Sequence, residues 1–229
     1  MPEKKVTATA KTAGRGSYAV GEARRRLILD TAVDHFGKWG FHASSLARIA
    51  HDCGITQGGL LHHFRSKEDL LLSVLAQSEE HDVARLLGVE QETYAAYLDA
   101  LVELIEENTR RPGIVRMFNV LVGESGNVGH PAHEYFRRRY ARVLAHGVER
   151  LEDAVRRGEL RPDVDCPAVA REYLAVMDGL QIQWALDPDS LDMPARVRDF
   201  LRRQYEAIRA TEGGTPAGGR AAPFPAGPA

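Results

Sequence analysis

The sequence predicts an all-α protein of about nine helices, in which a three-helix head with a helix-turn-helix precedes a larger helical domain. Between residues 22 and 210, apolar residues recur at helical spacing in nearly every segment, and none alternates convincingly as a strand would. Glycines and prolines fall where these segments begin and end. Two of the segments are short and are joined by a glycine-containing turn.

The composition is that of a soluble globular chain, with 229 residues of which 44% are hydrophobic and 27% charged. No apolar run reaches the roughly 18 residues of a membrane span, and the N-terminus lacks the apolar stretch of a secretory signal. Cys53 and Cys166 show no metal-binding or disulfide spacing. We therefore expect a cytoplasmic protein with no membrane contact, no cofactor and no metal ion.

Positive charge is concentrated near the N-terminus. Residues 1–69 hold 11 Lys and Arg against 7 Asp and Glu, whereas the remainder holds 19 against 25. A basic module on an acidic body suits a polyanionic partner for the N-terminal part alone.

The ends of the chain differ from its middle. Residues 1–21 carry scattered lysines without an apolar period and predict a disordered basic arm. Residues 211–229 are nearly all Gly, Pro and Ala and predict a disordered tail. We place the head at residues 22–66 and the larger domain at residues 67–210.

The predicted head has three helices. The first is expected from Glu22 to Lys38, with glycines around its end. Ser44 or Ser45 caps the second, whose apolar positions follow the i, i+3, i+4, i+7 spacing of a helix at Leu46, Ile49, Ala50 and Cys53. After a turn at Gly54, Thr56 caps a third helix that runs to about His63.

The larger domain begins with a long helix. Ser66 and Asp69 have the spacing of a capping box at its start. Prolines near the starts of later segments predict further helices near 92–109, 112–124, 131–157, 166–186 and 194–210.

The two short helices of the head have the features that a DNA-reading motif needs. The second of them begins with Thr56, Gln57, Gly58 and Gly59, which are small or polar. Gln57 can pair with an adenine edge, and Thr56 can reach a phosphate or a thymine methyl group. On pattern alone, an ordinary helical hairpin with polar ends is the alternative.

The stretches GFHASSLARIA (40–50), CGIT (53–56) and GLLHHFRSKEDL (59–70) resemble the DNA-binding domain of the TetR family of transcriptional regulators. The resemblance covers about residues 24–72, where a dozen positions agree in order and spacing. It implies a regulator whose N-terminal head binds double-stranded DNA and whose C-terminal helices bind a small molecule and form a homodimer. It also implies a bacterial, cytoplasmic protein.

The resemblance implies DNA contacts residue by residue. Ser45 should bind a phosphate, Arg48 should reach the major groove or its rim, and His63 and Lys67 should grip the DNA backbone. Leu61 stands where the family often has a phosphate-binding tyrosine, so His62 or His63 would have to replace that contact. The full set of expected DNA contacts is Ser44, Ser45, Arg48, Thr56, Gln57, Gly58, Leu61, His62, His63 and Lys67.

A single short recognition helix offers little contact with DNA, so two copies on a palindromic operator are expected. Residues 168–186 are apolar nearly all round, which indicates burial on more than one side. The resemblance assigns the last two helices to a four-helix dimer interface, against the alternative of an intramolecular core. The candidate contacts are Ala168, Ala175, Gly179, Ile182, Leu186, Val197, Leu201, Tyr205 and Ile208.

The resemblance also implies an effector pocket within the C-terminal helices. Adaptable and aromatic side chains with few polar anchors suit a largely apolar effector held by one or two hydrogen bonds. Taken singly, a residue of this kind belongs to the core more often than to a pocket. The candidate lining is Tyr97, Leu101, Met117, Phe118, Leu121, Tyr140, Leu144, Met177, Gln181 and Trp184.

The functional expectation is a repressor that leaves a palindromic operator when its effector binds, through a shift of the fourth helix. No nucleotide-binding, nucleophile or zinc-protease motif is present, and the order HPAHE at 130–134 is not that of a zinc protease. We therefore expect no enzyme. The alternative is a helical small-molecule-binding protein whose DNA-binding module is vestigial, and affinity for a specific operator distinguishes the two.

Overall fold

The computed structural model describes residues 13–86 and 91–210, and within these ranges it consists of nine helices and one isolated bridge between Leu160 and Arg209. This confirms the all-α prediction. The helices are α1 (Ala13–Ala43), α2 (Leu46–Asp52), α3 (Gln57–His63), α4 (Lys67–Leu86), α5 (Tyr94–Thr109), α6 (Pro112–Glu124), α7 (His133–Arg156), α8 (Cys166–Leu186) and α9 (Met193–Ile208).

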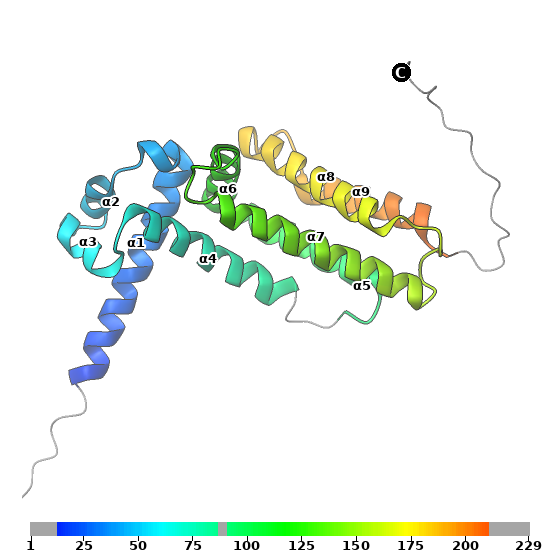
Figure 1. Ribbon diagram of the computed structural model, residues 1–229, viewed down its shortest axis with the longest axis horizontal. Helices are drawn as coiled ribbons and strands as arrows, with labels where there is room; N and C mark the ends of the chain where they lie inside the picture. The colour runs from blue at the N-terminus through cyan, green and yellow to red at the C-terminus, as the bar shows by residue number, and fades with distance from the viewer. Residues whose placement is uncertain (1–12, 87–90, 211–229) are drawn as a thin grey trace, which may run out of the picture.

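The molecule is elongated, with α2 and α3 at one end and the body of α5 to α9 extending away from them (Figure 1). The N-terminal turns of α1 extend beyond the rest of the head (Figure 1). Farther along, α1 packs against α6 and α4, which fixes the head on the body. No described helix is long and apolar enough to cross a membrane.

Helix α1 is longer than the sequence pattern indicated. It begins at Ala13, so residues 13–21, which we expected to belong to a disordered arm, are helical. Extending an existing helix adds main-chain hydrogen bonds without the cost of a new nucleus, and no proline interrupts this stretch. The helix also continues past Lys38, through a kink at Gly40, to Ala43. The predicted arm at 1–12 and the predicted tail at 211–229 lie outside the described residues.

The other helices lie within a few residues of their predicted bounds because local signals fix their ends. Prolines occupy the first turns of α6, α8 and α9. Side chains of Asp165 and Asp192 cap α8 and α9 by accepting from main-chain N–H groups. Ser66 caps α4, as the capping-box spacing predicted, with its hydroxyl 3.1 Å from the Asp69 nitrogen.

The core has two parts. The first joins the head to the body, because Phe36 and Ile49 of the head share a buried cluster with Met117 and Leu121 of α6. The second lies among α5, α8 and α9 and includes Leu98, Tyr173 and Val197. The first cluster therefore packs α1 of the head directly against α6 of the body.

Candidate DNA-binding and effector sites

A tight turn orients α3 relative to α2. Gly54 has φ of 66°, in the left-handed region that suits glycine, and its N–H donates to the His51 carbonyl oxygen at 2.9 Å. The Thr56 hydroxyl caps α3 by accepting from the Gly59 N–H at 3.1 Å, as predicted. Leu60 is fully buried and anchors the underside of α3. The opposite face of α3 is therefore directed outward.

Two polar contacts fasten the motif to α1. The Arg24 guanidinium donates to the Cys53 carbonyl oxygen at 3.1 Å, at the end of α2. His35 of α1 lies 2.9 Å from a carboxylate oxygen of Asp52. Hydrogen bonds from His51 and His35 hold the pKa of Asp52 below its usual range. These contacts join residues far apart in the sequence, and the pattern of the two short helices did not reveal them.

Most of the expected DNA contacts are exposed on α2 and α3 or directly before these helices. His63 is partly buried, and the others are exposed: Ser45, Arg48, Thr56, Gln57, Gly58, Leu61 and His62. Trp39 supports part of this surface, since the guanidinium of Arg48 lies 5.4 Å and the ammonium of Lys38 4.6 Å from its ring centroid. Trp39 was not among the predicted residues, and its sequence position at a helix end gave no signal of this support.

Two expected DNA contacts have a structural role instead. Ser44 is buried, and its hydroxyl lies 2.6 Å from the Gly40 carbonyl oxygen and 3.1 Å from that of His35. It is Ser45 that occupies the N-cap position of α2, although its side chain makes no capping hydrogen bond. The ammonium of Lys67 donates to the carbonyl oxygens of Phe41, His42 and Ser44 at 2.8, 3.2 and 3.0 Å. All three of its donors are thus occupied within the protein.

A cavity of about 400 Å³ lies within the body, which is in the size range of small-molecule sites. Residues of α5, α6, α7 and α8 line it, together with Ser78 and Glu79 of α4. Six of the ten predicted lining residues are among them: Tyr97, Leu101, Phe118, Tyr140, Met177 and Gln181. The cavity therefore forms where the sequence placed an effector pocket.

The other four predicted residues, Met117, Leu121, Leu144 and Trp184, do not line the cavity. Met117 and Leu121 are fully buried on a neighbouring face of α6, in the cluster that joins the head to the body. Trp184 is buried in the cluster with α9. The reason is helical phase, because neighbouring positions such as 117 and 118 are turned about 100° apart around a helix.

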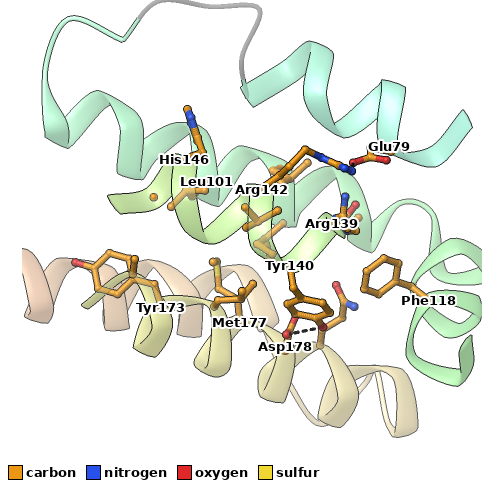
Figure 2. Close-up of a pocket in the computed structure, with 18 of the residues that line it drawn as sticks. Glu79, Leu101, Phe118, Arg139, Tyr140, Arg142, His146, Tyr173, Met177 and Asp178 are labelled. Carbon is orange, nitrogen blue, oxygen red and sulfur yellow. Dashed lines mark hydrogen bonds and ion pairs between the residues drawn. The ribbon is translucent and has the colours of Figure 1, made fainter. Parts of the chain in front are cut away.

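Several polar side chains of the cavity were missing from the predicted lining. Figure 2 shows Asp178, Tyr140 and Phe118 at one end and Tyr173 at the other, with Met177 between them. The Tyr140 hydroxyl donates to the Asp178 carboxylate at 2.9 Å. Arg142 of α7 pairs with Glu79 of α4. In the sequence these charged residues resemble those of solvent-exposed helix faces. Only the packing of α7 against its neighbouring helices shows that they line the cavity.

Two further polar side chains of the cavity have partners, whereas Nε2 of His146 has no hydrogen-bond partner among the described residues. The guanidinium of Arg139 lies 4.9 Å from the Phe118 ring centroid. The Gln181 amide donates to the Asn119 side-chain oxygen at 3.0 Å.

Burial shifts the pKa of several groups that line the cavity, among them Asp178 and His146. Loss of water around Asp178 raises the pKa of its carboxyl group, and the Tyr140 hydroxyl and the charge of Arg139 oppose this shift without cancelling it. Burial also lowers the pKa of His146, and the positive charge of Arg150 adds to the effect.

The expected dimer contacts divide between two environments. On α8, Ile182 is 51% and Leu186 83% exposed, and Ala168 and Ala175 are also exposed. Gly179 and Tyr205 are partly buried. On α9, however, the side chains of Val197, Leu201 and Ile208 are buried in the core of their own chain. The assignment of these three to a subunit interface is wrong, because the apolar face of α9 packs against α5 and α8.

Among residues 13–86 and 91–210, no three His, Cys, Asp or Glu side chains come together in a group that could hold a metal ion.

Comparisons with known proteins agree with this architecture. A sequence model of bacterial regulatory proteins of the tetR family matches residues 28–74, and one of the BetI-type transcriptional repressor C-terminal domain matches residues 126–210. A probable HTH-type transcriptional regulator of Pseudomonas putida, ArpR, is 30% identical over 202 residues, which cover 81% of this chain and 91% of ArpR. The chain belongs to the TetR family of transcriptional regulators.

Two further transcriptional regulators are similar to this TetR-family chain, one in sequence and one in structure. The HTH-type transcriptional regulator UidR of Escherichia coli K12 is 28% identical over 156 residues, covering 68% of this chain and 79% of UidR. The crystal structure of TylP, a TetR regulator from Streptomyces fradiae, is 27% identical, with a TM-score of 0.61 over 84% of this chain and 89% of TylP.

The TetR-family chain is thus a DNA-binding transcriptional regulator with a helix-turn-helix head and a C-terminal ligand-binding domain. Regulators of this family bind DNA and small-molecule effectors and act as dimers. They are not enzymes in general.

Proposed function

We propose that this regulator is a homodimeric repressor that leaves a palindromic operator when a small, largely apolar effector occupies the cavity. The proposal depends on one observation, which is that α4 connects the head to the cavity. This helix begins at the head, where Lys67 binds the end of α1, and reaches the cavity at Ser78 and Glu79. The match of residues 126–210 to the C-terminal domain of BetI-type repressors supports repression over activation.

Two contacts connect the cavity wall on α7 to α4. The Tyr135 hydroxyl donates to the Leu75 carbonyl oxygen at 3.2 Å, and Arg142 pairs with Glu79. Tyr135 and Arg142 also line the cavity. An effector that displaces these side chains therefore pulls on α4, and α4 is fastened to α1 at its first residue.

The switch is a shift between two populated states. A tilt of α4 changes the distance between the two recognition helices of the dimer, and an operator with fixed half-site spacing tolerates only one distance. The effector acts only to the extent that it binds the DNA-free state more tightly than the DNA-bound state. The regulator works through binding alone and carries out no catalysis.

The head recognises its operator through the outward surface of α2 and α3. Gln57 is exposed at the first position of α3 and is suited to pair with an adenine edge. Arg48 and Ser45 lie on the adjoining surface and are suited to phosphate contacts, which set register without reading sequence.

Selection of binding sites from a random duplex library tests the DNA-binding part. We expect a two-fold-symmetric site that the protein binds at least about 10³-fold more tightly than random duplex. Gln57→Ala should weaken binding to that site by about 1–3 kcal/mol and leave non-specific binding unchanged. Enrichment of no site, or binding without sequence preference, would contradict the proposal.

Uncoupling variants test the switch. Glu79→Gln removes the ion pair between α4 and α7, and we expect the operator to be bound normally but released less completely by an effector. Arg138→Leu is the control, because Arg138 is exposed and pairs with Glu134 inside α7. A reporter gene behind the selected site gives the sign of regulation, and expression that falls when the regulator gene is deleted would show an activator instead.

A further inference from the structure

The charged side chains that line the cavity are not equally provided with partners. Four such residues are present: Glu79, Arg139, Arg142 and Asp178. Glu79 and Arg142 form an ion pair with each other, and Arg139 lies over the ring of Phe118. Within the described part of the chain, Asp178 has no cationic side chain within ion-pair distance, and its one hydrogen bond comes from the Tyr140 hydroxyl.

A carboxylate in this position has lost part of its hydration, and the charge of Arg139 acts on it without forming an ion pair. Asp178 is partly buried on α8, beside the apolar side chains of Met177 and Leu174. One neutral hydrogen bond does not compensate a carboxylate for lost hydration, because buried charges are normally paired. An apolar effector without a donor would remove still more water from this oxygen and leave it unsatisfied.

The surroundings of Asp178 suit a positively charged nitrogen. Figure 2 shows the Tyr140 and Phe118 rings at the same end of the site as the carboxylate. The guanidinium of Arg139 already lies over the Phe118 ring, which shows that this ring can hold a cation. An ammonium group supplies the N–H donors that the carboxylate lacks. An anionic effector would instead compete with Glu79 for Arg142.

We propose that the effector is an amphipathic amine, whose apolar skeleton fills the cavity and whose protonated nitrogen binds the Asp178 carboxylate. This inference rests on the proposal that the cavity is the effector site. The volume of about 400 Å³ accommodates a two-ring aromatic or a comparable aliphatic skeleton.

Three probes with one ring system separate charge from apolar contact. We would titrate the full chain, without DNA and at neutral pH, with 2-(aminomethyl)naphthalene, 2-(hydroxymethyl)naphthalene and 2-naphthoate in a calorimeter. The amine should bind at least tenfold more tightly than the alcohol, as expected for a charge-assisted hydrogen bond, and 2-naphthoate should bind most weakly. Failure of the amine to bind, or equal affinity for amine and alcohol, overturns the inference.

The substitution D178N tests whether the preference for the amine over the alcohol depends on this carboxylate. It should weaken amine binding at least tenfold and change alcohol binding by less than twofold. Glu172→Gln is the matched control, because it removes one negative charge from an exposed position of α8 outside the cavity. Amine affinity that D178N leaves unchanged overturns the inference. The probe comparison on the unsubstituted chain remains decisive if D178N does not fold.

Two further measurements distinguish amine binding at Asp178 from effects on dimerisation and on operator release. Light scattering reports self-association, and a D178N variant that loses dimerisation but keeps its amine preference would assign Asp178 to the subunit interface and overturn the inference. Operator release is followed separately by fluorescence anisotropy. Tight amine binding without release would overturn the proposed function and leave only the amine preference of the cavity standing, whereas equal release by alcohol and amine would overturn the inference and leave the proposed function standing.

Discussion

The ammonium nitrogen of Lys67 lies 2.8 Å from the main-chain oxygen of Phe41 and 4.4 Å from the centroid of its ring. Lys67 is the first residue of α4, and Phe41 lies in the last turn of α1. One side chain therefore joins the helix that reaches the cavity to the helix that carries the DNA-binding motif. The carbonyl oxygens at the end of α1 gain donors that the helix itself cannot provide.

Replacing Lys67 with methionine should destabilise the protein without changing the number of phosphate contacts. The variant loses three hydrogen bonds from a charged donor, and we expect the free energy of unfolding to fall by about 1–3 kcal/mol. The dependence of operator affinity on salt should keep its slope, since the ammonium is occupied inside the protein. Urea denaturation and binding titrations at several salt concentrations measure both.

Lys38→Met is the control, because Lys38 is exposed and rests on Trp39. Its free energy of unfolding should stay within about 0.5 kcal/mol of the parent value. A Lys67→Met variant with full stability and a smaller salt slope would show that Lys67 contacts phosphate instead.

Gly40 should not tolerate a side chain. It has φ of 70°, and an added Cβ would overlap the carboxylate of Glu124. That carboxylate accepts from the Phe41 N–H at 2.8 Å. We expect Gly40→Ala to lower the free energy of unfolding by about 2 kcal/mol or more, through backbone strain and the displaced hydrogen bond.

Gly123 offers a matched glycine in α6, since an added Cβ there meets no atom within 4 Å. Gly123→Ala should be neutral or stabilise the protein by up to about 1 kcal/mol, because alanine favours the helix. Equal effects of the two substitutions in urea denaturation would contradict the assignment of strain to Gly40.

Acidification should weaken the junction between the head and the body through His130. This side chain is buried, and its Nδ1 accepts from the Ala132 N–H at 3.2 Å, so the imidazole is held neutral. Burial lowers its pKa below 6.5. The unfolded chain therefore binds more protons than the folded chain just below pH 6.5, and stability is lost as the pH falls through that region.

Thermal unfolding between pH 7.5 and 5 measures this effect in the parent and in His130→Gln. The variant should be less stable at pH 7.5, because glutamine does not reproduce the contacts of the ring, but its melting temperature should fall less on acidification. An identical pH dependence in the two proteins would exclude His130 as a source of the acid sensitivity.

A charge on the exposed face of α8 should separate the subunits. Ile182 is 51% exposed in the single chain, and the family acts as dimers. We expect Ile182→Asp to give monomers in sedimentation experiments and to lose operator affinity, since an unpaired buried charge is costly in an interface. Val128→Asp is the control, because Val128 is 79% exposed in the loop before α7. Dimers of Ile182→Asp would place the interface elsewhere.

Local patterns were enough to predict most helix boundaries. Thr56 caps α3 through its own hydroxyl, and Asp165 and Asp192 cap α8 and α9 within three residues. Such signals act over one helical turn, and the packing of the rest of the chain does not alter them. The exposure of the residues of α2 and α3 that we propose as DNA contacts was predictable for the same reason, as they lie close together in the sequence.

Residues that depend on distant neighbours were predicted less well. Ser44 and Ser45 look alike in the sequence, but only Ser44 faces the main chain of α1. Met117 and Phe118 are adjacent and both apolar, and the orientation of α6 alone decides that Phe118 lines the cavity. Val197, Leu201 and Ile208 form an apolar stripe that fits an interface in the sequence, but α5 covers it in the folded chain.

The sequence by itself determined the helices, their caps, the DNA-binding motif and the existence of apolar faces, because each depends on hydrogen bonds and periodicities within a few residues. Tertiary structure alone decided which apolar face closes inside the chain and which stays exposed. It also decided that Asp178 borders a cavity and that Lys67 is occupied at the end of α1. Burial and ion pairing are set by helices that meet from distant parts of the chain, and no local pattern encodes their relative rotation.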